Sequence, residues 1–351
     1  MLPEYVLNKA KAELLEYMDT GQSVMEMSHR SKEYLKIFEQ CEERFRDVLD
    51  IPDNYSVLFL QGGAYMQFSM LPANLMTVEK TADYVLTGSW AEKAAEEASK
   101  VGKVRIVASS KQDNYTYIPK IDPDELNPKA DYMHICYNNT IYGTSFSSTP
   151  YSVAPLAADV SSMILSKPLD VRDFGILYAG AQKNMGIAGL TVVIIKNSLC
   201  ERSPSELPSI FNYSIHQKNK SMFNTPATYA IYMMSLMLDW LKTEIGGLHE
   251  MERINNIKAG ILYDYLDESK IFKGTVQKDS RSIMNICFRS NDDSLNADFC
   301  SRAAADGYLN LTGHRLVGGM RASIYNAMPI EGVVSLRDYM MAFEKEHTYN
   351  A

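Results

Sequence analysis

The sequence contains few cysteines, and their spacing does not suit a zinc site or a disulfide framework. Only five of the 351 residues are cysteine, and no two form a Cys-x-x-Cys pair; they are Cys41, Cys136, Cys200, Cys287 and Cys300. An odd and dispersed set of this kind is typical of free thiols in a reducing compartment. We therefore expect no metal site and a cytoplasmic protein.

Long hydrophobic runs and an excess of positive charge are also absent. The longest apolar stretches, such as Leu190–Ile195, are far too short to cross a bilayer. The first residues lack the basic start and apolar run of a signal peptide. The formal net charge of −8, from 35 Lys+Arg against 43 Asp+Glu, argues against a general nucleic-acid or membrane binder. An anionic ligand would need positive charge that is gathered locally.

The remaining pattern predicts an α/β fold with a mostly parallel sheet. Helical periodicity is present near residues 3–18 and 31–49, and helices are also expected at 63–75 and 90–101. Between and after them lie short, continuously apolar runs, as expected for buried parallel strands. The expected strands are 56–60, 84–86, 104–107, 132–136, 157–160, 176–178 and 190–195.

The last third of the chain indicates a second, smaller unit. A long helix is expected over 226–243, and Gly246-Gly247 interrupts the helical pattern before another helix over 248–266. Strands near 283–288 and 319–324 alternate with helices near 295–305 and 330–343. We expect a large cofactor-binding domain over 1–246 and a small C-terminal α+β domain over 247–351.

Three features carry candidate chemistry. Gly62-Gly63 lie between an expected strand and a helix, where free N–H groups can bind phosphate, although a structural turn explains such a pair equally well. Asp159 ends a strand, either as a ligand contact or as an N-cap. Lys183 lies among small residues, either in a surface turn or as a nucleophile for a carbonyl. Together they fit pyridoxal 5'-phosphate, which needs a phosphate cup, a carboxylate and an amine.

Two His-Arg dipeptides could supply the local positive charge. They are His29-Arg30 and His314-Arg315, and arginine binds carboxylate and phosphate through two parallel hydrogen bonds. Either pair alone also fits a surface ion pair. Together they could hold an anionic substrate.

Five segments resemble the phosphoserine aminotransferases. They are VMEMSHRSK (24–32), FLQGG (59–63), AGAQKN (179–184), MFNTP (222–226) and GHRLVGGMRAS (313–323), and the likeness extends over nearly the whole chain. The resemblance implies a fold-type I homodimer that uses pyridoxal 5'-phosphate. It also implies amino-group transfer between L-glutamate and 3-phosphohydroxypyruvate in serine biosynthesis, and action on the phosphorylated hydroxythreonine precursor in pyridoxine biosynthesis.

The same resemblance implies roles for individual residues. Lys183 is the expected Schiff-base lysine and Asp159 the partner of the ring nitrogen, while Trp90 stacks on the ring and Thr140 bonds the ring hydroxyl. Ala64, Tyr65 and Gln182 are expected to form the phosphate cup. Asn224 and Thr225 are expected to contact the cofactor phosphate of the neighbouring subunit. The residues expected to contact the substrate are His29, Arg30, His314 and Arg315.

Three departures from the family pattern and two alternative functions stay open. Relatives usually carry a short Asn-Phe-Ser-x-Gly-Pro segment before Met1-Leu2-Pro3; either its absence loosens closure over the substrate, or the sequence itself starts late. Tyr65 replaces the usual Arg, Ser or Thr, and Tyr142 replaces a residue that is often acidic. The alternatives are another enzyme of the same fold, such as an alanine–glyoxylate aminotransferase or a sulfur-mobilising lyase, and a non-catalytic dimeric homologue.

Overall fold

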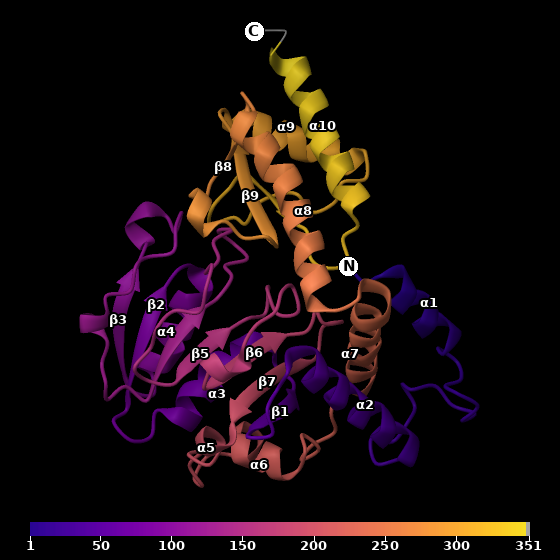
Figure 1. The fold of residues 1–351 in the computed structure, drawn as a ribbon, viewed down its shortest axis with the longest axis vertical. Helices are drawn as coiled ribbons and strands as arrows, with labels where there is room; N and C mark the ends of the chain where they lie inside the picture. The colour runs from indigo at the N-terminus through magenta and orange to yellow at the C-terminus, as the bar shows by residue number, and fades with distance from the viewer. Residues whose placement is uncertain (349–351) are drawn as a thin grey trace.

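The computed structural model describes residues 1–348, and its larger part is built on a seven-stranded sheet, whose arrangement can be followed in Figure 1. The order of the strands across this sheet is β1-β7-β6-β5-β4-β2-β3. Their bounds are β1 Tyr55–Leu60, β2 Thr81–Leu86, β3 Lys103–Ser109, β4 Tyr132–Cys136, β5 Leu156–Asp159, β6 Ile176–Gly180 and β7 Thr191–Lys196. Strands β3, β2, β4, β5 and β6 pair in parallel, whereas β7 is antiparallel to both of its neighbours.

Helices cover both faces of this sheet, which is why its strands are almost continuously apolar. Leu58 and Leu60 of β1 point into a core beneath α3 (Gly63–Leu75) and α4 (Ser89–Ser99). The alternate residues Val57 and Phe59 point into the opposite core, beneath α2 (Lys32–Leu49) and α7 (Thr228–Trp240). The expected α/β class with a mostly parallel sheet is confirmed.

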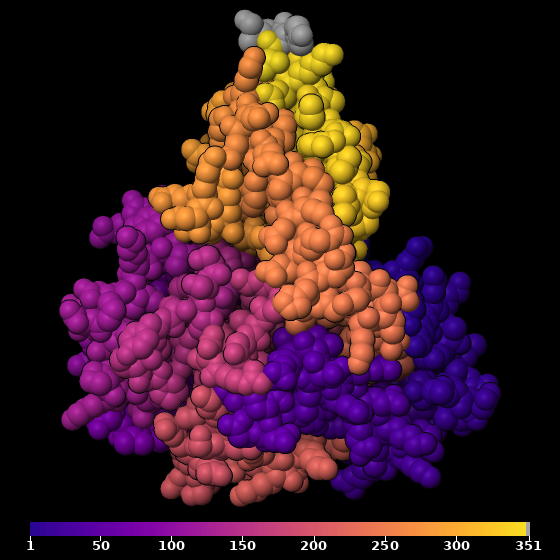
Figure 2. All heavy atoms as spheres, in the orientation of Figure 1, coloured from indigo at the N-terminus to yellow at the C-terminus, as the bar shows by residue number. Residues whose placement is uncertain are grey.

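The C-terminal part forms a second, three-stranded antiparallel sheet with its own core. Its strands are β8 (Phe272–Gly274), β9 (Asn285–Ser290) and β10 (Met320–Ser323), in the order β10-β9-β8. Helices α8 (Leu248–Glu268), α9 (Asp293–Ala305) and α10 (Ile330–Thr348) share a hydrophobic core with one face of it. Figure 2 shows this part, in orange and yellow, standing on one side of the rest of the molecule.

The boundaries of several elements differ from the expectation for local reasons. The first helix, α1 (Glu4–Ala12), ends six residues early, with Glu13 as its C-cap, and the apolar side chains of Leu14 and Leu15 beyond it are exposed, so no core contact extends the helix. Helix α7 begins at Thr228 and passes into a π-helical turn over Leu241–Ile245. Three short elements were not expected: α5 (Asn197–Cys200), α6 (Tyr213–Lys218) and β8.

Lys258 on α8 is fully buried and holds the segment between β10 and α10. Its ammonium donates hydrogen bonds to the carbonyl oxygens of Ile324 at 3.2 Å, Tyr325 at 2.9 Å and Met328 at 3.1 Å. Burial lowers the pKa of Lys258 to about 8, so the group is still mostly protonated at pH 7. Asn326, in the same segment, contacts the residue that follows Lys183 in the sequence: its backbone N–H donates to Oδ1 of Asn184 at 3.0 Å.

We expect Lys258→Met to destabilise the protein by about 3 kcal/mol, because several buried carbonyl oxygens lose their donor. The measurement is urea unfolding at pH 7. Lys270→Met, at an exposed lysine of the same C-terminal part, is the matched control and should change stability by less than about 0.5 kcal/mol. Equal stabilities of the two variants would contradict a structural role for Lys258.

Candidate active site

The candidate site lies at the carboxyl ends of β4, β5 and β6. Asp159, the last residue of β5, pairs with Cys136 at the end of β4 and with Tyr178 on β6. Because parallel strands end at the same edge of a sheet, the loops that follow β4 and β6 meet beside Asp159. Ligands of α/β proteins bind at such an edge.

Lys183 and Thr140 meet at this edge. Lys183 lies three residues after β6, and its Nζ donates a hydrogen bond of 2.8 Å to Oγ1 of Thr140, in the loop after β4. Burial raises the pKa of the Cys136 thiol; Asp159 raises it further, and Lys183 lowers it. Cys136 pairs with Asp159 at the strand ends, and Lys183 reaches the loop after β4 through Thr140, so the carboxylate and the amine lie at one edge of the sheet.

One carboxylate oxygen of Asp159 accepts a hydrogen bond within the described chain, and the other is free to accept one. Its side chain is buried, and Oδ1 accepts a hydrogen bond of 2.9 Å from the N–H of Ser161. This contact is a local turn of the kind expected from an N-cap. No donor within residues 1–348 reaches Oδ2. A buried carboxylate with a free acceptor suits a protonated ring nitrogen.

The glycine turn before α3 has the geometry of an anion cradle. Gly62 and Gly63 have φ values of 87° and 66°, and α3 begins at Gly63 with Ala64 and Tyr65 in its first turn. The N–H groups of a first helical turn have no intrahelical acceptor. Asn224 lies against the same turn, because its Nδ2 donates to Oε1 of Gln61 at 3.1 Å.

The side chains of two other residues that are expected to contact the cofactor phosphate are exposed. Gln182 is exposed, and its side chain lies over Gly180, where a Cβ would come within 2.6 Å of Gln182 Oε1. Thr225 is exposed beside Asn224.

Trp90 lies in the first turn of α4, within an aromatic group. Its ring centroid is 5.6 Å from that of Tyr65, edge to face, and 6.5 Å from that of Phe68. The indole Nε1 is buried and has no hydrogen-bond partner in the described part of the chain. Tyr65 itself is 55% exposed. An unpaired buried N–H beside the site favours a binding role over simple packing.

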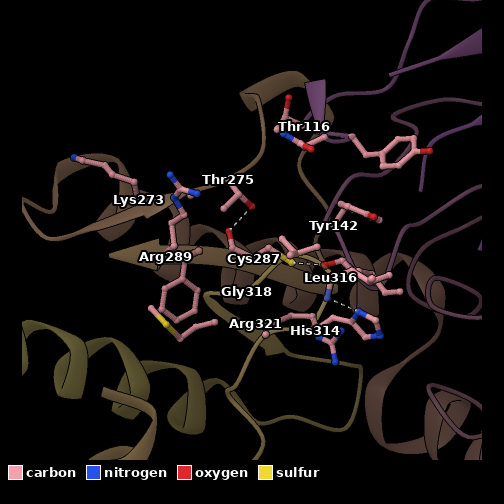
Figure 3. A pocket seen from close by; sticks show the side chains of 18 residues that line it. Thr116, Tyr142, Lys273, Thr275, Cys287, Arg289, His314, Leu316, Gly318 and Arg321 are labelled. Atoms are coloured by element: carbon pink, nitrogen blue, oxygen red, sulfur yellow. Dashed lines mark hydrogen bonds between the residues drawn. The ribbon is translucent and has the colours of Figure 1, made fainter. Parts of the chain in front are cut away.

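A cavity of about 470 Å³ adjoins this edge and is walled by the C-terminal sheet (Figure 3). Arg321 of β10 lines it and donates from Nη1 to the carbonyl oxygen of Thr140 at 3.2 Å, so Thr140 contacts both Arg321 and Lys183. The Nε of Arg321 is buried without a partner among residues 1–348. Sequence reasoning missed this residue, although it stands inside the quoted GHRLVGGMRAS segment.

The two His-Arg pairs are not brought together within one chain. His314 lines the cavity, whereas Arg315 is exposed beside it and does not. His29 and Arg30 lie in the turn before α2, and no hydrogen bond or ion pair in the described region joins their side chains to the cavity. Of these four residues, the cavity within one chain is lined by His314 alone.

The side chain of His314 is a neutral imidazole that can donate a hydrogen bond. Partial burial lowers its pKa below the usual value, and the nearby positive charges of Arg321 and Arg315 lower it further. The N–H of Leu316 donates to its Nδ1 at 3.3 Å, so we infer that the neutral ring carries its proton on Nε2. That proton is available to an anion in the cavity.

The chain belongs to the aminotransferase class-V family, whose sequence model matches residues 1–336. It is a transaminase that depends on pyridoxal 5'-phosphate. No helix within residues 1–348 is long and apolar enough to span a membrane.

Several close relatives share one name. The phosphoserine aminotransferase of Bacillus cereus is 51% identical over 348 residues, which cover 99% of this chain and 96% of the relative. The solved phosphoserine aminotransferase of Bacillus circulans subsp. alkalophilus superposes with a TM-score of 0.96 at 43% identity and covers 99% of this chain and 96% of its own. A phosphoserine aminotransferase from Trichomonas vaginalis, solved with PLP bound, has a TM-score of 0.92 at 36% identity and covers 97% of each chain.

Proposed function

We propose that this chain is a phosphoserine aminotransferase, which moves an amino group between L-glutamate and 3-phosphohydroxypyruvate and so forms phosphoserine for serine biosynthesis. One observation carries the proposal. Thr140 joins the amine of Lys183 to the guanidinium of Arg321, so a reactive nitrogen and a carboxylate-binding group stand together beside a free carboxylate. We further propose action on the phosphorylated hydroxythreonine precursor of pyridoxine, which has the same charged groups.

The residues of the edge fit the cofactor that the family uses. Pyridoxal 5'-phosphate, when bound, supplies an aldehyde and an electron-withdrawing ring. We propose that Lys183 Nζ holds the aldehyde and afterwards moves the proton at the substrate α-carbon. Asp159 Oδ2 holds the proton on the ring nitrogen, because a buried carboxylate stabilises the adjacent positive charge.

The other expected roles stand as proposals with local support. Trp90 packs against the ring, while Thr140, whose Oγ1 accepts from Lys183 Nζ, donates to the ring hydroxyl. The first turn of α3, through Ala64 and Tyr65, and Gln182 bind the phosphate group. Tyr65 contributes its backbone, because its ring packs against Trp90.

We propose that the active unit is a homodimer. On the family resemblance, Asn224 and Thr225 would reach the phosphate of the neighbouring subunit's cofactor; within one chain, Asn224 Nδ2 donates to Gln61 Oε1. His29 and Arg30 would likewise join His314 and Arg315 from the second chain to hold the substrate carboxylate and phosphate. Arg321 takes a carboxylate in the same chain, since its fork suits that group.

We also propose a division of the chain into two domains and a location in the cell. The division into 1–246 and 247–351 is supported by Gly246 and Gly247, whose φ values of 89° and 103° allow the chain to turn between α7 and α8. A cytoplasmic location is supported by the five free cysteines, four of which are buried.

The test is a comparison of amino donors with the purified holoenzyme. We expect kcat/KM for phosphoserine to exceed that for serine or alanine by about 10²-fold or more, because the partly buried Arg321 and His314 and the cations that line the cavity would lose their anionic partner with the uncharged analogue. Glutamate should shift the absorbance of the bound cofactor. A preference for alanine or serine would favour an alanine–glyoxylate type of activity, and the absence of any spectral change would favour a non-catalytic homologue.

A further inference from the structure

The three strands of the C-terminal sheet separate apolar from cationic side chains. Phe272, Phe288 and Met320 point into the core beneath α8 and α10. On the opposite face, Lys273 of β8 pairs with Arg289 of β9, and Arg321 of β10 pairs with Cys287, two residues along β9 from Arg289. Because alternate residues of a strand share a face, Lys273, Arg289 and Arg321 all lie on the face that walls the cavity.

The inner end of this face is covered and the outer end is open. Cys287 Sγ donates to the carbonyl oxygen of Ile141 at 3.4 Å, and a Cβ on Gly143 would lie 2.8 Å from the carbonyl oxygen of Asn285. The loop after β4 therefore covers the sheet as far as Cys287. Arg289, the next residue outward on this face, is exposed at the cavity (Figure 3).

Arg289 is the cation left without a partner at this outer end. The ammonium of Lys273 is held by the carbonyl oxygen of Ser269. The guanidinium of Arg289 has no hydrogen bond or ion pair with any residue from 1 to 348. Lys273 and Arg289 are like charges directly opposite each other in the sheet, and such pairs destabilise a sheet. An anion bound between or beside them would offset their repulsion.

The charge of the whole cavity is also exceptional for this chain. The described residues that line it include three cationic side chains, Lys273, Arg289 and Arg321, together with the neutral His314, but no aspartate or glutamate. The protein as a whole has a formal net charge of −8. A cavity walled by one sign of charge concentrates field lines and attracts ligands of the opposite sign.

We propose that Arg289 forms an outer anion-binding subsite, where the phosphate or carboxylate group of an incoming substrate binds before the substrate reaches Arg321 and Lys183. The identity of that substrate rests on the proposed function, but the binding of an anion does not. Attraction grows with ligand charge, so 3-phosphohydroxypyruvate benefits more than glutamate. The subsite raises capture and does not take part in proton transfer.

Steady-state kinetics of Arg289→Gln test the capture role. At low ionic strength we expect kcat/KM for 3-phosphohydroxypyruvate to fall about tenfold, with a smaller loss for glutamate and an unchanged kcat. In 1 M NaCl the variant should match the wild type, because the Debye length falls to about 3 Å. Arg289→Lys should recover most of the loss. A loss that persists in high salt, or that appears in kcat, would show that Arg289 contacts the reacting substrate, and would overturn the proposal.

The matched control is Arg337→Gln, which removes the same charge from α10, on the core side of the same sheet. It should stay within about twofold of the wild type. Calorimetric titration of the holoenzymes with inorganic phosphate separates this proposal from the activity itself. We expect Arg289→Gln to bind one phosphate fewer per chain than wild type or Arg337→Gln. Equal phosphate binding by all three proteins would refute the subsite, even if the chain proved to be an active aminotransferase.

Discussion

Lys183→Ala is expected to lower kcat by at least about 10³-fold, because the variant loses both the amine that holds the cofactor and the group that moves the α-carbon proton. The fold should be unaffected, since within residues 1–348 Lys183 Nζ makes a single hydrogen bond, to Thr140 Oγ1. The measurement is the absorbance change of the reconstituted protein on addition of glutamate, followed to completion. Thermal unfolding of the same samples checks that the variant is folded.

Lys196→Ala is the matched control for this substitution. Lys196 is also partly exposed, and it ends β7, which is antiparallel to β6, so it lies at the opposite edge of the sheet. Its removal should leave kcat within about twofold of the wild type. Similar glutamate responses from the two variants would remove Lys183 from the reaction.

Asp159→Asn is expected to reduce kcat by about 10²–10³-fold, because the amide cannot stabilise a proton on the ring nitrogen. Asparagine keeps the size of the side chain and an oxygen that can accept the 2.9 Å bond from Ser161 N–H. The melting temperature should therefore change by only a few degrees. The measurements are kcat with glutamate and the position of the cofactor absorbance band.

Asp170→Asn supplies a close structural match. Asp170 Oδ1 accepts a bond of 2.9 Å from the N–H of Arg172, two residues on, as Asp159 does from Ser161, but it is exposed. Its kcat should equal that of the wild type. If Asp159→Asn retained activity at the level of Asp170→Asn, the carboxylate would have only the capping role.

The central sheet could be predicted because its strands are buried on both faces. The runs that became β4, β5, β6 and β7 are almost wholly apolar, and their ends were expected to within about two residues. The three-residue strand β8 gave no such signal, because Phe272, Lys273 and Gly274 are too few for a period to be seen. The early end of α1 could not be predicted from the helical pattern, because the pattern continues through Leu14 and Leu15 although both side chains are exposed.

The positions of site residues could be predicted from the sequence only for residues at or just after the ends of predicted strands. Asp159 and Lys183 follow adjacent parallel strands, so topology alone brings them near each other. Trp90 and Thr140 were expected from family resemblance and not from spacing. Arg321 was missed because one arginine in a short strand looks like a surface residue until the pairing register shows which face it occupies.

Lys258 shows the limit of reasoning from residue type. A lysine within a helix is usually solvated, yet this one is fully buried and bonded to backbone carbonyl oxygens. Its pKa is lowered to about 8, which is also a property of nucleophilic lysines. Its ammonium is enclosed by the 324–328 segment, whereas Lys183 is partly exposed at the strand edge. Geometry therefore assigns the structural role to Lys258 and the chemical role to Lys183.

The most direct test of this assignment is to treat the holoenzyme with sodium borohydride, which fixes the cofactor to the lysine that carries it, and to map the modified residue by peptide mass spectrometry. Our account predicts one phosphopyridoxyl group per chain, on Lys183. Modification of Lys258 or of any other lysine, with Lys183 unmodified, would contradict it.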